Sequence, residues 1–173
     1  MPKAMHLTSP TRYASRGDFR RIFYEETDSL YRLSFLLTVD SEKARQCFVS
    51  GLEDSVNGNP VFKDWARSRA RRAIIQNGVR MINPRPTEEN ARSDSNAEGR
   101  TLAKGQPEIA AVLELPPFER FVFVMSVLEH YSEHECSIVV GCSRREVVAA
   151  RIRALRQIGS AMGADSRWQV VSA

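Results

Sequence analysis

Arginines are concentrated near the C-terminal end of this chain of 173 residues. Residues 144–158 hold five arginines and one glutamate, whereas residues 108–143 hold six acidic residues and one basic residue. A guanidinium group can bind a phosphate oxygen or pair two-fold with the edge of a guanine base. The abrupt change of charge therefore favours contact with DNA, and a solvated amphipathic helix at the edge of a bundle is the alternative. The five residues are Arg144, Arg145, Arg151, Arg153 and Arg156.

Two capping patterns of the form S-x-x-E begin at Ser132 and at Ser143. In such a pattern the serine hydroxyl and the glutamate carboxylate satisfy amide groups that a helix start leaves free. Gly141 lies between the two patterns and can adopt the left-handed conformation that ends a helix. This order predicts a short helix, a glycine turn and a second helix ending at Gly159, which is a helix-turn-helix.

The five arginines then have different expected roles on the second helix. Arg144 and Arg145 lie in its first turn, where a helix-turn-helix makes its base contacts. Arg153 and Arg156 are expected at the DNA backbone or in solvent. Arg151 either contacts DNA or pairs with an acidic residue of the preceding helices.

A second basic segment lies in the front half, where residues 41–83 carry eight basic and four acidic groups. A helix is expected from about Pro60 to Ile82, with one apolar side and a side crowded with arginines. We expect Trp65 in the core rather than stacked on a base. The arginine side is either a second DNA contact or a solvated face. Its candidate DNA contacts are Arg67, Arg71 and Arg72.

The spacing of hydrophobic residues divides the chain into two segments. In both segments hydrophobic residues recur at helical spacing, and between the segments this pattern is lost and polar residues, glycine and proline dominate. We therefore predict an all-α protein of two small helical domains joined by a flexible linker, the second domain ending in the helix-turn-helix. The predicted parts are a tail (1–17), a first domain (18–83), the linker (84–107), a second domain (108–159) and a tail (160–173).

Each predicted domain contains several helices. Asp18 is a candidate cap for one long first helix, with Tyr31, Phe35 and Leu36 in the core. A second helix follows to about Val56, ahead of the arginine-rich third. The second domain should begin with helices over about 108–115 and 118–130, before the two helices already described.

Enzyme chemistry has no support in the sequence. There is no glycine-rich phosphate loop, nucleophile elbow or supported carboxylate pair, so no catalytic or cofactor-binding residue is predicted. His130 and His134 have helical spacing, but the helix start at Ser132 separates them, and no metal site is expected. The odd set of three cysteines, with no secretory signal or membrane span, favours the cytoplasm, and Cys142 is interpreted as a small packed residue rather than a redox switch.

A family resemblance adds to this interpretation. Leu115-Pro116-Pro117-Phe118-Glu119-Arg120 with the apolar residues up to Met125, followed by Leu128-Glu129-His130-Tyr131-Ser132, resembles the opening of the fourth conserved region of bacterial sigma factors. Gly141, Val147 and Arg153-Ala154 continue it. Residues 31–38, Gln46 with Phe48, and Trp65 with Ala70 are similar, more weakly, to the second conserved region. Two such regions with only a linker between them are the layout of the extracytoplasmic-function class.

The resemblance implies a function and a set of partners. A sigma factor of this class binds core RNA polymerase and directs it to promoter DNA. The resemblance implies that Glu42, Gln46 and Phe48 contact the polymerase, and that the helix-turn-helix reads the more distant promoter element. The class often has an anti-sigma partner, and the sequence leaves open whether this chain has one.

The chain also departs from the family pattern. Glu146, Val148 and Ala150 stand where threonine, lysine and arginine are common, and Arg72 stands where the third helix usually carries a smaller polar residue. Promoter choice is therefore not expected to be typical. Two alternatives stay open: a degenerate sigma-like regulator that binds polymerase or another regulator without recognising a promoter, and a one-domain helix-turn-helix repressor.

Overall fold

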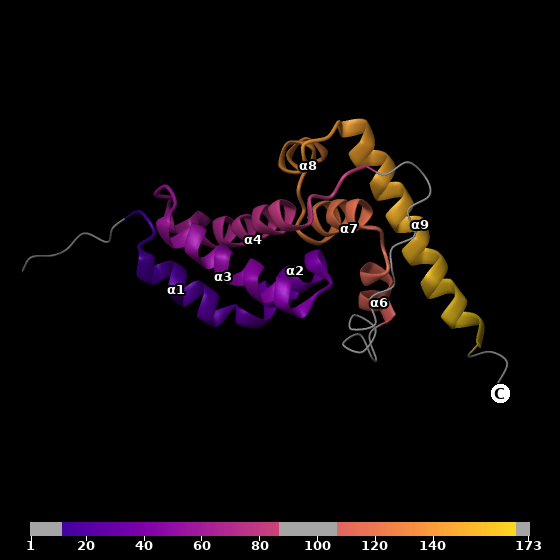
Figure 1. Cartoon of the computed structure of the whole chain (residues 1–173), viewed down its shortest axis with the longest axis horizontal. Coiled ribbons are helices and arrows are strands. Elements are labelled where there is room, and N and C mark those ends of the chain that lie inside the picture. Colours follow the sequence, from indigo (N-terminus) through magenta and orange to yellow (C-terminus); the bar gives the residue numbers. More distant parts are fainter. Residues whose placement is uncertain (1–11, 87–106, 169–173) are drawn as a thin grey trace, which may run out of the picture.

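The computed structural model describes residues 12–86 and 107–168, with side chains as far as Gly163 (Figure 1). These residues are helical and contain no β-strand, only an isolated bridge between Tyr13 and Phe62. The all-α fold class is thus confirmed. The N-terminal half (residues 12–86) contains α1 (Arg16–Glu25), α2 (Thr27–Thr38), α3 (Ser41–Asn57), the 3-10 helix η1 (Lys63–Trp65) and α4 (Ala66–Ile82). The C-terminal half (residues 107–168) contains α6 (Pro107–Leu113), α7 (Pro117–Phe123), the π-helix η2 (Val124–Leu128), α8 (Glu133–Val140) and α9 (Arg144–Trp168).

The predicted single first helix is wrong, because the chain forms two helices that meet at Glu26. The backbone of Glu26 has φ −108° and ψ 23°, outside helical values, and the Thr27 hydroxyl donates to the Phe23 carbonyl oxygen at 2.7 Å. A side-chain bond of this kind competes with the regular helix and bends it. The cap is also different: Ser15 is the N-cap of α1, and Asp18 completes its capping box instead of capping the helix itself.

The core of the N-terminal half is formed by α1, α2, α3 and α4. Phe35 and Leu36 are buried as predicted, whereas Tyr31 is 37% exposed at the edge of the core. Helices α3 and α4 approach each other closely at Gly51 of α3, where an added Cβ would lie 2.7 Å from a side-chain carbon of Ile74 on α4. Glycine at this position lets the two helices touch, and a larger residue would force them apart.

The C-terminal half is built around α7 and α9. The predicted helix 118–130 begins one residue earlier, at Pro117, changes to a π-helix, and ends before His130, which has a positive φ of 58°. The last helix was predicted to end at Gly159, but it continues to Trp168. A glycine inside a helix costs about 1 kcal/mol relative to alanine, which the helix-forming residues around it can offset. Figure 1 shows α9 lying along α7 and α6.

The two halves pack directly against each other, with α7 against α2 and α8 near α4 (Figure 1). Gly78 of α4 is buried at this junction, where an added Cβ would lie 3.2 Å from Leu37 and 3.4 Å from Phe121 of α7. Arg120 of α7 donates to the Leu37 carbonyl oxygen at 3.4 Å and to the Leu115 carbonyl oxygen at 2.8 Å. Its burial lowers the pKa of the guanidinium to about 10.

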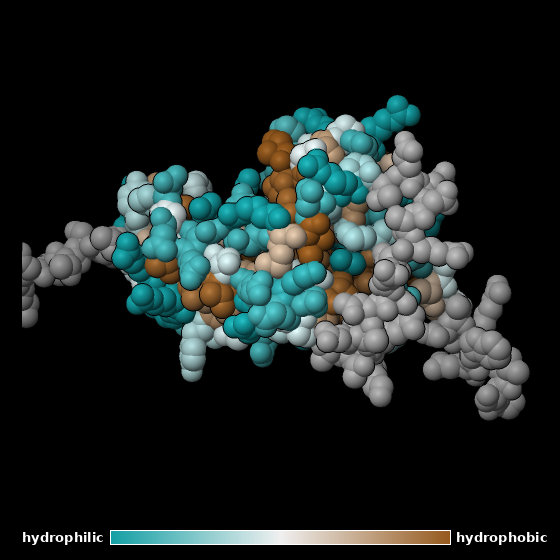
Figure 2. Space-filling view, in the orientation of Figure 1, coloured by the Kyte–Doolittle hydropathy of each residue, from teal (hydrophilic) through white to brown (hydrophobic). Residues whose placement is uncertain are grey.

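Hydrophobic side chains are unevenly distributed over the surface. On the face drawn in Figure 2, hydrophobic side chains gather in a band from α8 toward α7, and much of the N-terminal half is hydrophilic. The large exposed hydrophobic residues of η2 and α8 are Leu128 and Ile138. Among the described helices, none is both long and apolar enough to cross a bilayer. The predicted linker lies almost entirely outside the described residues, and the division into two domains stays a prediction.

Candidate nucleic-acid interface

The turn between α8 and α9 has the predicted local geometry. Gly141 is left-handed, with φ 77°, and its amide donates to the Ser137 carbonyl oxygen at 2.9 Å. The Ser143 amide donates to the Glu146 carboxylate at 2.7 Å, and the Glu146 amide donates to the Ser143 hydroxyl at 3.2 Å. The Ser143 hydroxyl also donates to the Glu146 carboxylate at 2.7 Å, and this bond, together with the bond from the Ser143 amide, lowers the pKa of Glu146. The capping box therefore fixes the direction in which α9 starts.

Three of the five arginines between positions 144 and 156 of α9 have free guanidinium groups. Arg144, Arg145 and Arg156 are exposed, and within the described part of the chain they form no ion pair. Arg144 and Arg145 lie in the first turn, directly after the capped start. Guanidinium groups presented by the N-terminal turn of an exposed helix can reach base edges or phosphates of a DNA duplex.

Arg151 and Arg153 of α9 bind carboxylates of their own half. Arg151 donates to Glu133 of α8 at 2.7 Å, which is the intramolecular alternative predicted for it. Arg153 binds the buried Glu119 of α7 through two nitrogens, at 2.9 and 2.7 Å. Both side chains therefore fasten α9 to the helices beneath it, although each stays partly exposed.

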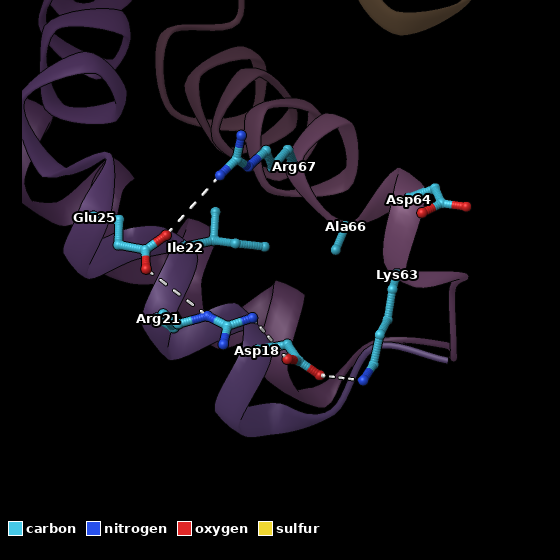
Figure 3. Close-up of a pocket in the computed structure, with 8 residues that line it drawn as sticks. All are labelled: Asp18, Arg21, Ile22, Glu25, Lys63, Asp64, Ala66 and Arg67. Atoms are coloured by element: carbon cyan, nitrogen blue, oxygen red, sulfur yellow. Dashed lines mark hydrogen bonds and ion pairs between the residues drawn. The ribbon is translucent and has the colours of Figure 1, made fainter. Parts of the chain in front are cut away.

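The predicted DNA contacts of α4 are also divided. Arg67 is exposed but reaches back to α1, with its nitrogens 3.0 Å from Glu26 and 3.9 Å from Glu25. Arg67 lies beside a hollow of about 250 Å³. Figure 3 shows Asp18, Arg21, Glu25 and Lys63 around it, alternating in charge. Asp18 and Glu25 each face two of these cations, so their ion pairs join α1 to η1 and α4, whereas Asp64, which also lines the hollow, points away from it (Figure 3).

Arg71 is held by the other half of the molecule. Its Nε and Nη2 donate to the two carboxylate oxygens of Glu129 at 2.6 and 2.5 Å. Its Nη1 donates to the Ser29 hydroxyl at 3.1 Å. The bonds to Glu129 raise the pKa of Arg71. A residue expected to contact DNA thus joins the two halves in this conformation.

An aromatic surface lies beside this ion pair. Tyr13 stacks on Phe62 with ring centroids 4.9 Å apart, and Phe62 meets Trp65 edge-to-face at 5.3 Å. Tyr13 is 50% exposed and Trp65 is 62% exposed, so the prediction that Trp65 belongs to the core is wrong. Trp65 is the last residue of the 3-10 helix η1 rather than part of the regular helix that was expected, and its ring faces outward.

Trp65 also lines a groove of about 420 Å³ between α4 and the segment before α8. Arg69 and Arg72 of α4 and Tyr131 of the C-terminal half line the same groove, and the acidic Glu129 and Glu135 lie at its other side. Exposed rings next to cations are what proteins use to bind single-stranded nucleic acid, because every base has a face that can stack. The sequence did not indicate Tyr13, which falls in the predicted N-terminal tail.

The predicted polymerase contacts lie on α3. Glu42 and Gln46 are exposed, and the Gln46 amide donates to the Glu42 carboxylate at 3.0 Å. Arg45 also binds Glu42 and lowers its pKa. Phe48 instead packs inward, with its ring centroid 5.2 Å from that of Phe23. Val49, which is 43% exposed and follows Glu42 and Gln46 at helical spacing, is an apolar surface residue that sequence reasoning missed.

The titratable residues near the turn between α8 and α9 do not form a metal site. No group of His, Cys, Asp and Glu in the described residues could hold a metal ion. Burial raises the pKa of the Cys136 thiol to about 11, and it also raises that of Cys142. Cys142 packs against the hydrophobic core, in line with its interpretation as a packed residue.

Comparison with known proteins finds neither a protein-family model nor a curated protein sequence that matches this chain.

Proposed function

We propose that this chain is a sigma-type protein that binds core RNA polymerase and directs it to promoter DNA. The observation that carries the proposal is the presence of two different DNA-compatible surfaces on one chain. The first turn of α9 presents Arg144 and Arg145 without ion pairs among the described residues, and η1 presents Trp65 beside Arg69 and Arg72. A protein that opens a promoter has to bind both duplex and single-stranded DNA.

The α9 surface suits the duplex. Its two arginines follow a capped helix start, so the helix end can approach a groove with its backbone direction fixed. Each arginine gives sequence discrimination if it pairs with a guanine, and gives only affinity if it binds a phosphate.

The Trp65 surface suits an unpaired strand. Stacking of a base on an exposed aromatic ring contributes about 1–3 kcal/mol, and neighbouring arginines attract the backbone. Trp65 and Tyr13 offer exposed rings, and Arg72 forms no ion pair within the residues that the structure describes. DNA contact by Arg71 additionally requires that its pair with Glu129 be broken.

The proposal is tested by binding and transcription with the full-length chain. Purified core polymerase should be retained by the tagged chain, and the reconstituted enzyme should initiate at a promoter selected from a random library. The double variant Gln46→Ala, Val49→Asp should weaken retention, because both side chains lie exposed on α3. Failure of the unmodified chain to retain core polymerase at low salt would overturn the proposal.

A second candidate function is a sigma-like regulator that binds polymerase or another protein without recognising a promoter. Ile152 and Leu155 favour it, because they are 42% and 48% exposed on the outer side of α9, where a DNA-reading helix normally carries polar residues. Selection of bound duplexes from a random pool separates the two. An enriched motif supports the promoter binder, and retention of core polymerase without any enriched motif supports the regulator.

A further inference from the structure

Helix α9 has two apolar faces, and the fold accounts for only one of them. The inner face, with Val147, Ala150 and Ala154, is fully buried and packs on the rest of the C-terminal half. On the opposite face Ile152 and Leu155 are 42% and 48% exposed. A surface helix normally carries one apolar stripe and a polar outer side. The second stripe therefore needs an explanation outside the packing of this half.

The outer residues are spaced as in a coiled coil. Alternating steps of three and four residues along α9 follow the same side of the helix, which is the spacing of the seam positions in a heptad repeat. This outer seam spans about 25 Å at 1.5 Å per residue. Its positions are Arg145, Val148, Ile152, Leu155, Gly159 and Met162.

The positions that flank the outer seam are basic. Arg144 and Arg151 lie on one flank and Arg156 on the other, and Glu146 lies outside both flanks, where it caps the helix. Arg144 and Arg156 form no ion pair in the described ranges, and Arg151 is bound to Glu133. Flanking charges select the partner of a coiled coil, because opposite charges attract across the seam and like charges repel.

A second copy of the chain is a poor occupant of this seam. In a parallel pair of α9 helices, Arg151 of one helix would face Arg156 of the other. In an antiparallel pair, the flank with Arg144 and Arg151 would face the same flank of the second helix, and the flank with Arg156 would likewise face its equivalent. Either orientation brings arginines together and supplies no carboxylate. A helix with glutamate or aspartate on its flanks would instead place carboxylates opposite these arginines.

We infer that the outer seam of α9 is a docking surface for an acidic amphipathic helix of a partner protein. The apolar side of that helix packs on Val148, Ile152 and Leu155, and its acidic flanks pair with Arg144 and Arg156. Because the seam includes Arg145, the docked helix covers the first turn of α9 and excludes DNA from it. The docking surface does not depend on the proposed function.

The test uses the full-length chain and a labelled synthetic helical peptide with leucine at the seam positions and glutamate on both flanks. Fluorescence anisotropy should show binding that is about tenfold tighter than that of the same peptide with lysine flanks, and that weakens with added salt. The glutamate peptide with serine at its seam positions should not bind. Equal binding of the acidic and lysine peptides, or full binding of the serine-seam peptide, would overturn the inference.

Variants of the protein show where the peptide binds. Ile152→Ser with Leu155→Ser should reduce binding by about tenfold or more, whereas the control Val49→Ser on α3, at a matching exposure of 43%, should leave it unchanged. Arg144→Glu with Arg156→Glu should reverse the preference toward the lysine peptide. Circular dichroism confirms folding, and all of these residues are exposed or half-exposed, so the helix should form.

Two results contradict the docking surface. Peptide binding that survives the Ile152→Ser, Leu155→Ser change would mean that the acidic peptide binds elsewhere by charge alone. A dimer in sedimentation equilibrium that the same change abolishes would identify a second copy as the occupant. Retention of core polymerase is measured separately, so loss of the proposed function and loss of the docking surface are distinguishable outcomes.

Discussion

Arg71 of α4 and Glu129 at the end of η2 form a two-fold ion pair that joins the two halves of the chain, with nitrogen–oxygen distances of 2.6 and 2.5 Å. The side chain of Glu129 is only 8% exposed, so its charge depends on Arg71 for a partner. A half-buried, two-fold pair of this kind differs from the pair between Arg21 and Glu25 of α1, whose side chains are 65% and 49% exposed.

Replacing Arg71 by alanine should lower the free energy of unfolding by about 1–3 kcal/mol, because it leaves the Glu129 carboxylate poorly solvated. Urea denaturation measures this change. The control is Arg80→Ala, which breaks the exposed pair with Asp54 and should cost less than about 1 kcal/mol. Near-equal costs for the two variants would show that the junction between the halves does not depend on Arg71.

Acid should loosen the starts of α8 and α9. The hydrogen bonds from Ser132 and Ser143 lower the pKa values of Glu135 and Glu146, so the folded state holds these carboxylates charged more readily than the unfolded state. Their contribution to stability is therefore complete above the ordinary glutamate pKa of 4.5 and is lost as the pH falls through the lower folded-state values. Far-UV circular dichroism across this acid range measures the loss.

The matched control for the acid effect replaces both carboxylates by glutamine. Glutamine can still bond to the backbone amide of the serine in a capping box, but it does not titrate. The double variant Glu135→Gln, Glu146→Gln should thus show a shallower dependence of helicity on pH in the acid range. An unchanged acid profile would assign the transition to other carboxylates.

The cysteines should react slowly and in a fixed order. Burial raises the pKa values of Cys47 and Cys136 to about 11, which leaves almost no thiolate at neutral pH, and both side chains are inaccessible. Cys142 is only partly buried, so iodoacetamide should modify it first. Mass spectrometry of the native and urea-denatured chain measures the order. Rapid modification of Cys136 in the native chain would contradict the packing of α8 on α9.

The correctly predicted features depend on residues that lie close together in the sequence. The turn at Gly141 and the capping box at Ser143 depend on residues within one helical turn, and both formed as expected. The internal partner of Arg151 was one of two alternatives, because the preceding helix carries acidic residues. Local signals of this kind need no knowledge of tertiary packing.

The features that could not be predicted depend on contacts between distant segments. Trp65 looked like a core residue because it precedes an apolar helical pattern, and its exposure follows from the 3-10 turn and from Phe62. The pair between Arg71 and Glu129 joins residues 58 positions apart, across a segment that carries no hydrophobic period. The exposure of Ile152 is visible only once the inner face of α9 is known.

Replacing Trp65 by alanine should weaken binding of single-stranded DNA by about 1–3 kcal/mol and have a small effect on stability, because the ring is 62% exposed. Fluorescence titration with a single-stranded oligonucleotide measures the affinity. Trp65→Phe, which keeps an aromatic face, should retain most of it. If the alanine and phenylalanine variants bind equally well, the ring does not stack on a base.

Substitutions in the first turn of α9 should show whether Arg144 and Arg145 contact bases or phosphates. If Arg144 or Arg145 pairs with a guanine, its replacement by alanine should cost about 1–3 kcal/mol at one position of the selected duplex and relax the choice of base there. A phosphate contact should instead weaken binding to all duplexes and make the salt dependence shallower. Affinity for the selected duplex and its single-base variants, measured at several salt concentrations, distinguishes the two.

The control for these variants is Arg153→Ala on the same helix. Arg153 is bound to the buried Glu119, so its loss should lower the free energy of unfolding, with a smaller effect on DNA affinity than the loss of Arg144 or Arg145. Because all three changes remove one positive charge from α9, a difference between them reports position rather than net charge. Equal losses of DNA affinity in the three variants would mean that α9 binds DNA by its overall charge and not through its first turn.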